Sequence, residues 1–115
     1  MLRPFRRLLA ALELFRIAGG RDHPIQLLIT FLFVADHPNC RQGVLTRVTG
    51  MSVASVSRCL DWLGPVHRSG KSGLDLIHRE QDPTDYRRYR LSLTAKGQKV
   101  ADLMAQALQW SSQDD

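Results

Sequence analysis

Cysteines and long apolar runs are both scarce in this sequence of 115 residues. Two cysteines, Cys40 and Cys59, are too few for a disulfide scaffold, so a reducing cytoplasm is the expected setting. The longest apolar patch, residues 25–35, is interrupted by Gln26 and Thr30. It is well short of the roughly 20 apolar residues that cross a bilayer. We therefore expect neither a disulfide-bonded secreted domain nor a membrane protein.

The residue patterns of catalysis are missing as well. No Ser, His and acid arrangement, phosphate-binding glycine loop or pair of carboxylates occurs at an interpretable spacing. His37 and Cys40 resemble half a metal site, but zinc ligands normally come in more closely spaced pairs. Cys59 is expected to be a small buried apolar residue rather than a redox switch. The sequence predicts a protein that is not an enzyme and needs no metal or other cofactor.

Acidic residues are outnumbered by basic ones. The chain has 16 Lys and Arg against 11 Asp and Glu, a net charge of +5, which is typical of a partner for a polyanion. Residues 41–90 contain nine of the cations and five of the acids, so much of the excess lies in the middle of the chain. The length suits one domain with a modest core, for which burial against a second copy would add stability.

Apolar residues at spacings of three and four predict five helices. The expected helices cover residues 4–17, 24–35, 41–49, 52–63 and 95–110. For the first segment, an Arg-rich presequence is the alternative. Residues expected to face inward from the middle three helices are Ile25, Leu28, Ile29, Leu32, Phe33, Val44, Leu45, Val48, Val53, Val56, Leu60 and Leu63.

Alternating apolar residues predict two antiparallel strands, residues 74–79 and 89–94, with Leu74, Leu76 and His78 on one face of the first. The element order is that of a helix-turn-helix followed by a two-stranded wing. The predicted fold is mainly α with a small antiparallel β-hairpin, a winged helix-turn-helix dimerised through its terminal helices. The expected division is a dimerisation helix (1–20), a DNA-binding domain (21–94) and a C-terminal helix with a polar tail (95–115).

Helix 52–63 is the predicted recognition helix. Ser52 is a good N-cap, and the polar or small residues of the first two turns are expected to face a DNA major groove. Arg58 is long enough to reach guanine or phosphate, although a solvated surface arginine is the alternative. The candidate contacts on this helix are Ser52, Ala54, Ser55, Ser57 and Arg58.

The wing, residues 80–90, has two adjacent cations at its tip, Arg87 and Arg88. An arginine on a narrow hairpin can enter a minor groove, where the negative potential is strongest when the groove is narrow. Asp85 is placed to pair with Arg87 and to fix its direction. The alternative is an edge hairpin whose charges prevent aggregation.

Two motifs in and after the wing resemble the MarR (multiple antibiotic resistance regulator) family. Residues 82–87 are Asp-Pro-Thr-Asp-Tyr-Arg, and residues 93–97 are Leu-Thr-Ala-Lys-Gly, at the spacing of the family pattern Asp-Pro-x-Asp-x-Arg followed by Leu-Thr-x-x-Gly. The resemblance covers roughly residues 24–104. It implies a homodimer with recognition helices in successive major grooves and wing arginines in flanking minor grooves. By the same resemblance, Arg87 is the minor-groove arginine and Asp85 orients it.

The sequence departs from the family at three places. Tyr86 stands where the family often has an arginine, and residues 64–73 exceed the usual connection between recognition helix and wing. Either the helix continues past Pro65 or a basic loop is inserted here. We expect a solvated loop, with phosphate contacts from His67, Arg68 and Lys71 as the alternative. The terminal helices are short for the family, so we expect no ligand pocket and no small-molecule effector.

Two functions are compatible with these features. The first is a sequence-specific double-stranded DNA-binding regulator, a homodimeric repressor acting on the nucleoid. The second is a winged-helix module that binds an acidic protein partner. The cation excess of residues 41–90 favours the first. Candidate phosphate contacts are Arg41, Arg47, Arg68 and Lys71.

Overall fold

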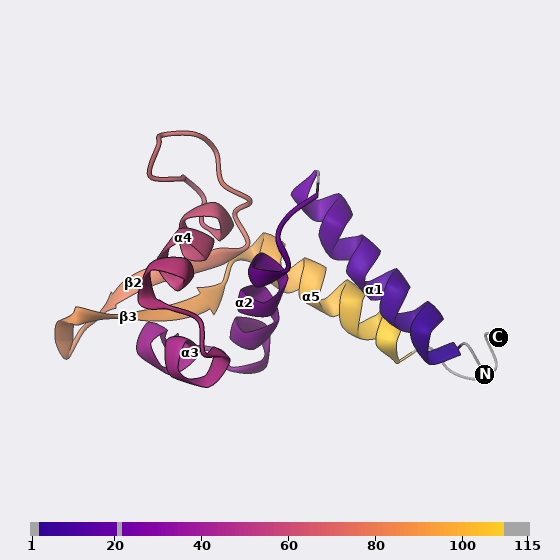
Figure 1. Cartoon of the computed structure of the whole chain (residues 1–115), viewed down its shortest axis with the longest axis horizontal. Helices are drawn as coiled ribbons and strands as arrows, with labels where there is room; N and C mark the ends of the chain where they lie inside the picture. The colour runs from indigo at the N-terminus through magenta and orange to yellow at the C-terminus, as the bar shows by residue number, and fades with distance from the viewer. Residues whose placement is uncertain (1–2, 21, 110–115) are drawn as a thin grey trace.

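Helices make up most of the chain, with a small antiparallel sheet on one side (Figure 1). The structure is a computed structural model that describes residues 3–20 and 22–109. Its elements are α1 (Arg3–Gly19), α2 (Ile25–Asp36), β1 (Cys40–Arg41), α3 (Gln42–Thr49), α4 (Val53–Leu63), β2 (Ile77–Asp82), β3 (Asp85–Leu93) and α5 (Ala95–Leu108). The predicted fold class, mainly α with a small antiparallel sheet, is confirmed, whereas dimerisation through the terminal helices stays a prediction. Trp110, expected in the last helix, and the tail that follows lie outside the described residues.

The sheet has a third strand that the sequence did not predict. β1 pairs with β3 in the order β1-β3-β2, with Cys40 opposite Leu91. A strand of two residues is too short to show an alternating pattern. The first wing strand also begins later than predicted, at Ile77. Residues 74–76 instead lie beside the C-terminal end of α4, where the Leu76 amide donates a hydrogen bond to the Leu63 carbonyl.

The buried faces of several elements differ from the prediction. On β2, Ile77 is buried and His78 is exposed, the reverse of the expected alternation. Val48 and Val53, expected to face inward, are exposed. On α2 the buried residues are Leu27, Thr30, Phe31 and Val34, whereas Ile25, Ile29 and Leu32 are exposed. A helix that is apolar on most sides gives no periodic signal for the face that meets the core.

The core lies between the helices and the sheet. Phe31, Leu45, Leu63 and Leu91 are among its fully buried side chains. They come from α2, α3, α4 and β3, so burial of their apolar surface holds the helix-turn-helix against the wing sheet.

A tight turn joins α3 to α4. Gly50, at φ +73°, ends α3 in the left-handed conformation that glycine adopts without steric cost. Ser52 then caps α4, its side chain accepting a hydrogen bond from the Ser55 amide at 3.1 Å. The predicted N-cap is confirmed.

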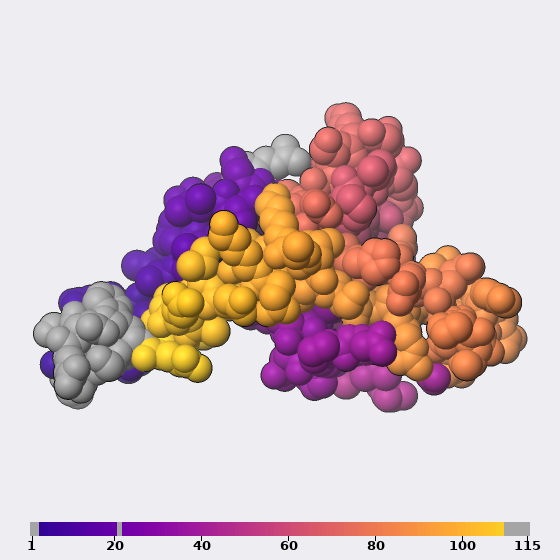
Figure 2. All heavy atoms as spheres, turned by 180° about the vertical axis from the view of Figure 1, so that it is seen from behind, coloured from indigo at the N-terminus to yellow at the C-terminus, as the bar shows by residue number. Residues whose placement is uncertain are grey.

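Helices α1 and α5 pack along each other and extend away from the wing (Figures 1 and 2). Ala11 and Phe15 are buried on α1, and the Phe15 and Phe31 rings lie 5.3 Å apart. Three large apolar residues of α1, Phe5, Leu8 and Leu9, are exposed in the single chain. No helix within the described residues is long and apolar enough to span a membrane.

Candidate nucleic-acid interface

The first two turns of α4 present small and polar side chains outward. Ser52, Ala54 and Arg58 are exposed, and Ser55 is half-buried. The Arg58 guanidinium donates a hydrogen bond to the Ser55 hydroxyl at 3.3 Å. The Ser52 hydroxyl donates one to the same oxygen at 3.0 Å. These contacts place Arg58 over the start of α4, while the opposite side of the helix is buried in the core.

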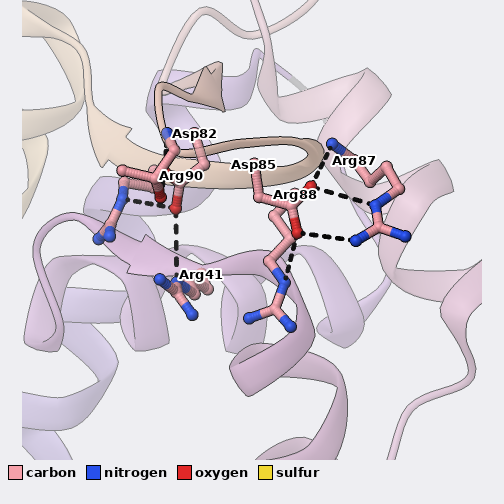
Figure 3. A network of polar contacts seen from close by, with 7 residues as sticks. Arg41, Asp82, Asp85, Arg87, Arg88 and Arg90 are labelled. Carbon is pink, nitrogen blue, oxygen red and sulfur yellow. Dashed lines mark hydrogen bonds and ion pairs between the residues drawn. The ribbon is translucent and has the colours of Figure 1, made fainter.

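The tip of the wing holds two arginines on one carboxylate (Figure 3). Arg87 donates to Asp85 from Nε at 3.2 Å, from its second guanidinium nitrogen at 3.4 Å and from its backbone amide at 3.1 Å. Arg88 Nε lies 3.3 Å from Asp85 Oδ2, the oxygen that also accepts the hydrogen bond from the second guanidinium nitrogen of Arg87. The hydrogen bonds from Arg87 lower the pKa of Asp85, so the acid is ionised and attracts both cations at neutral pH. The Asp85–Arg87 pair predicted from the sequence is present.

Arg87, at the wing tip, is almost fully accessible to solvent. Asp85 orients Arg87, yet 90% of the Arg87 side chain is exposed. An oriented, exposed guanidinium loses less conformational freedom on binding a ligand than one that is free to rotate.

A second carboxylate, Asp82, joins the three strands at the base of the wing (Figure 3). It is fully buried and accepts a hydrogen bond from Arg90 Nε at 3.1 Å, with Arg41 Nε at 3.5 Å. Arg90 also donates to the Asn39 carbonyl, which precedes β1. The spacing of residues along the chain does not predict this cluster, although Asp82 begins the wing motif. Arg41 lies some forty residues before Asp82 in the chain, so no local spacing reveals their contact.

Asp82 makes folding stability depend on pH in the acid range. Hydrogen bonds from the Thr84 hydroxyl and amide, then the charges of Arg90 and Arg41, lower the pKa of Asp82 from 3.8 to about 2 despite its burial. A carboxyl group whose pKa is lower in the folded than in the unfolded protein stabilises the fold at pH values above its unfolded pKa. For Asp82 this stabilisation is lost as the pH falls from about 4 to about 2.

We therefore expect Asp82→Asn to lower the melting temperature at pH 7, with the difference from wild type narrowing between pH 4 and 2. Thermal unfolding followed by circular dichroism at several pH values measures this. Asp102→Asn, which changes an exposed acid on α5, is the control and should follow the wild-type curve. A deficit in Asp82→Asn that stays constant with pH would contradict the assignment.

The four candidate phosphate contacts fall into two groups. Arg47 on α3 and Lys71 after α4 are exposed. Arg41 and Arg68 instead form ion pairs, with Asp82 and Asp61 respectively. Arg41 thus has a structural contact at the wing base, which sequence spacing could not show.

A cavity of about 460 Å³ lies between the start of α2 and the outer side of α4. His23, Arg58, Cys59 and Trp62 are among its lining residues. A cavity alone does not show that a ligand binds there, so the expectations of no ligand pocket and no small-molecule effector both stay predictions. Burial raises the pKa of the Cys59 thiol, which agrees with its predicted place inside the protein. Within residues 3–20 and 22–109, no group of three or more His, Cys, Asp or Glu side chains is arranged to hold a metal ion.

Comparison with known proteins places the fold. No family model matches the sequence, and no curated protein matches it. Solved structures do match. A crystal structure of MarR superposes with a TM-score of 0.62 and 24% identity over 90% of this chain and 74% of that one. The transcriptional regulator Tm0710 from Thermotoga maritima gives a TM-score of 0.68 and 22% identity over 90% and 66%.

A third match is a structure of overoxidized AbfR bound to DNA, with a TM-score of 0.62 and 17% identity over 89% of this chain and 68% of that one. At these identities the likeness establishes the fold. The chain has the winged-helix architecture of the MarR structures, as the wing motif predicts, and spans between 66% and 74% of the length of these three proteins.

Proposed function

We propose that this protein is a sequence-specific regulator of transcription that binds double-stranded DNA in the cytoplasm. The observation on which the proposal depends is the pair of wing arginines held outward by Asp85, at the same end of the molecule as α4 (Figure 1). A cation so oriented and so exposed suits a phosphate-lined groove. In this proposal α4 enters the major groove through Ser52, Ala54, Ser55, Ser57 and Arg58, while Arg87 and Arg88 enter the flanking minor groove.

We further propose that the functional unit is a homodimer and that it represses transcription by occupying its site. Exposed apolar side chains on α1 and α5 support this, because Leu8, Leu9, Leu103 and Leu108 all remain at least 40% exposed in the single chain. A second copy would cover them. Two copies related by a twofold axis would place their α4 helices about one helical turn of DNA apart.

The test is binding to duplex DNA as a function of salt. A binding site is first selected from a random duplex pool, and its dissociation constant is then measured by fluorescence anisotropy between about 50 and 200 mM salt. A protein that neutralises several phosphates loses affinity steeply over this range. Failure to bind duplex DNA at any salt concentration would overturn the proposal and favour the acidic-protein partner.

Arg47→Ala tests the surface beyond the wing. If Arg47 contacts a phosphate, the variant should bind all DNA sequences more weakly. The magnitude of the slope of log association constant against log salt concentration should decrease by about one. Lys99→Ala removes an exposed cation from α5 instead and should leave the slope unchanged. An unchanged slope in Arg47→Ala would exclude Arg47 from the interface.

A further inference from the structure

The stretch after α4, expected to be a solvated loop, is a closed hairpin. The His67 amide donates to the Lys71 carbonyl at 2.8 Å, and the Gly73 amide donates to the Pro65 carbonyl at 3.0 Å. Gly73 is needed at its base, since a Cβ there would overlap the Gly64 carbonyl oxygen. We call residues 65–73 the α4–β2 hairpin. It projects beside α4 at the same end of the molecule as the wing (Figure 1).

Side-chain contacts fasten this hairpin to α4. The His67 and Trp62 rings lie 4.0 Å apart. Arg68 donates to the Asp61 carboxylate and also places a guanidinium nitrogen 3.5 Å from the Ser57 hydroxyl. The hairpin thus extends the surface that includes Ser57, one of the predicted DNA contacts.

Asp61 is unexpected at this position. It follows Ala54 and Arg58 at intervals of seven and three residues, so it lies on the same outward stripe of α4 as two predicted DNA contacts. It is nevertheless only 8% exposed, because Arg68 from the hairpin and Arg79 from β2 flank it. Arg79 lies 3.5 Å from the second carboxylate oxygen.

This arrangement repeats the device at the wing tip, where Asp85 orients Arg87 and Arg88. In both places one carboxylate holds two arginines. The Arg68 side chain remains 59% exposed while it is held, so its outer edge is open to a further anionic partner.

We propose that Asp61 is a positioning residue for DNA binding. It holds Arg68, and with it the α4–β2 hairpin, against the outward face of α4, where Arg68 and Lys71 contact the phosphate backbone beside the major groove. This inference rests on the proposed function and adds Arg68 and Lys71 to the DNA contacts proposed for α4 and the wing.

The alternative is that the arginines merely neutralise Asp61. The two models predict opposite signs for Asp61→Asn, which removes a negative charge from a DNA-facing surface. If Arg68 and Arg79 only mask the acid, the variant has one more net positive charge and binds DNA more tightly. If Asp61 positions Arg68, the variant binds more weakly in spite of that gain.

The experiment compares Asp61→Asn, Asp61→Glu and Arg68→Ala with wild type on the selected duplex, by anisotropy at several salt concentrations. Positioning predicts about a tenfold loss of affinity for Asp61→Asn and a salt slope lower by about one, as for Arg68→Ala. Asp61→Glu should recover part of the loss. Asp102→Asn, which removes a different acid from α5, should match wild type. Unchanged or tighter binding by Asp61→Asn overturns the proposal.

A second variant guards against misfolding. If Asp61→Asn does not fold by circular dichroism, Arg68→Lys decides, because lysine keeps the charge but lacks the fork that bridges Asp61 and Ser57. Positioning predicts weaker binding by Arg68→Lys, and wild-type affinity contradicts it. Trypsin cleavage after Lys71 in the absence of DNA reports hairpin docking separately and should be faster in Asp61→Asn. Loss of DNA binding by wild type itself would refute the proposed function rather than the docking.

Discussion

Replacing Leu8 and Leu9 of α1 with glutamate should convert the proposed dimer to monomers and weaken DNA binding by about 100-fold. Both side chains are exposed in the single chain, at 46% and 60%, so the double variant Leu8→Glu/Leu9→Glu leaves the fold of one subunit intact. In a dimer it would bury two carboxylates per subunit in an apolar interface, which is strongly unfavourable. A monomer then occupies one half-site and lacks the binding free energy that a second, linked subunit gains at the other half-site.

Sedimentation velocity measures the assembly, and anisotropy on a two-half-site duplex measures the affinity. Arg6→Glu, an exposed change on the same helix without loss of apolar surface, is the control and should remain dimeric. If the double variant stays dimeric, the interface lies instead on α5, where Leu103 and Leu108 are exposed.

Arg87→Ala should weaken binding by roughly 1 to 3 kcal/mol for each contact, and most strongly at sites with A·T-rich flanks. The reason is the narrow minor groove of A·T-rich DNA, whose negative potential is greatest where an inserted guanidinium would lie. Competition between duplexes that differ only in their flanks measures the effect directly.

Arg88→Ala is the matched control for this experiment. It removes the same charge from the same carboxylate, with Arg88 Nε 3.3 Å from Asp85, but leaves Arg87 in place. The dependence on the flanking sequence should therefore weaken more in Arg87→Ala than in Arg88→Ala, because the Arg87 side chain is 90% exposed and the Arg88 side chain 57%. Equal affinity of Arg87→Ala and wild type for A·T-flanked sites would remove Arg87 from the mechanism.

The wing tip was predictable because its contacts are local. Asp85 and Arg87 are two residues apart on a short hairpin, so their pairing follows from the motif. The wing base was not predictable in the same way. Asp82 meets Arg41 across some forty residues of chain, and the two-residue strand β1 that places Arg41 there has no pattern of its own.

The same distinction applies to the helices. Spacing of apolar residues and the Ser52 cap located all five helices that lie within residues 3–20 and 22–109, because hydrogen bonding and capping within a helix depend on neighbours in the chain. The face that each helix buries depends on what it packs against. Because α2 is apolar on nearly all sides, its sequence does not show that Phe31 is buried and Ile25 exposed.

Residues 64–76 show the division most clearly. Their Ser, Gly and Lys content indicated a solvated loop, and nothing in that composition indicates a hairpin. The hairpin exists because Asp61, Trp62 and Gly64 at the end of α4 offer a carboxylate, an aromatic ring and a backbone close enough to pair with. Local chemistry thus determined the elements and the wing motif, whereas contacts between distant segments determined the buried faces, the third strand and the shape of this hairpin. Such contacts form only when the chain is folded, so they produce no periodic pattern of residues in the sequence.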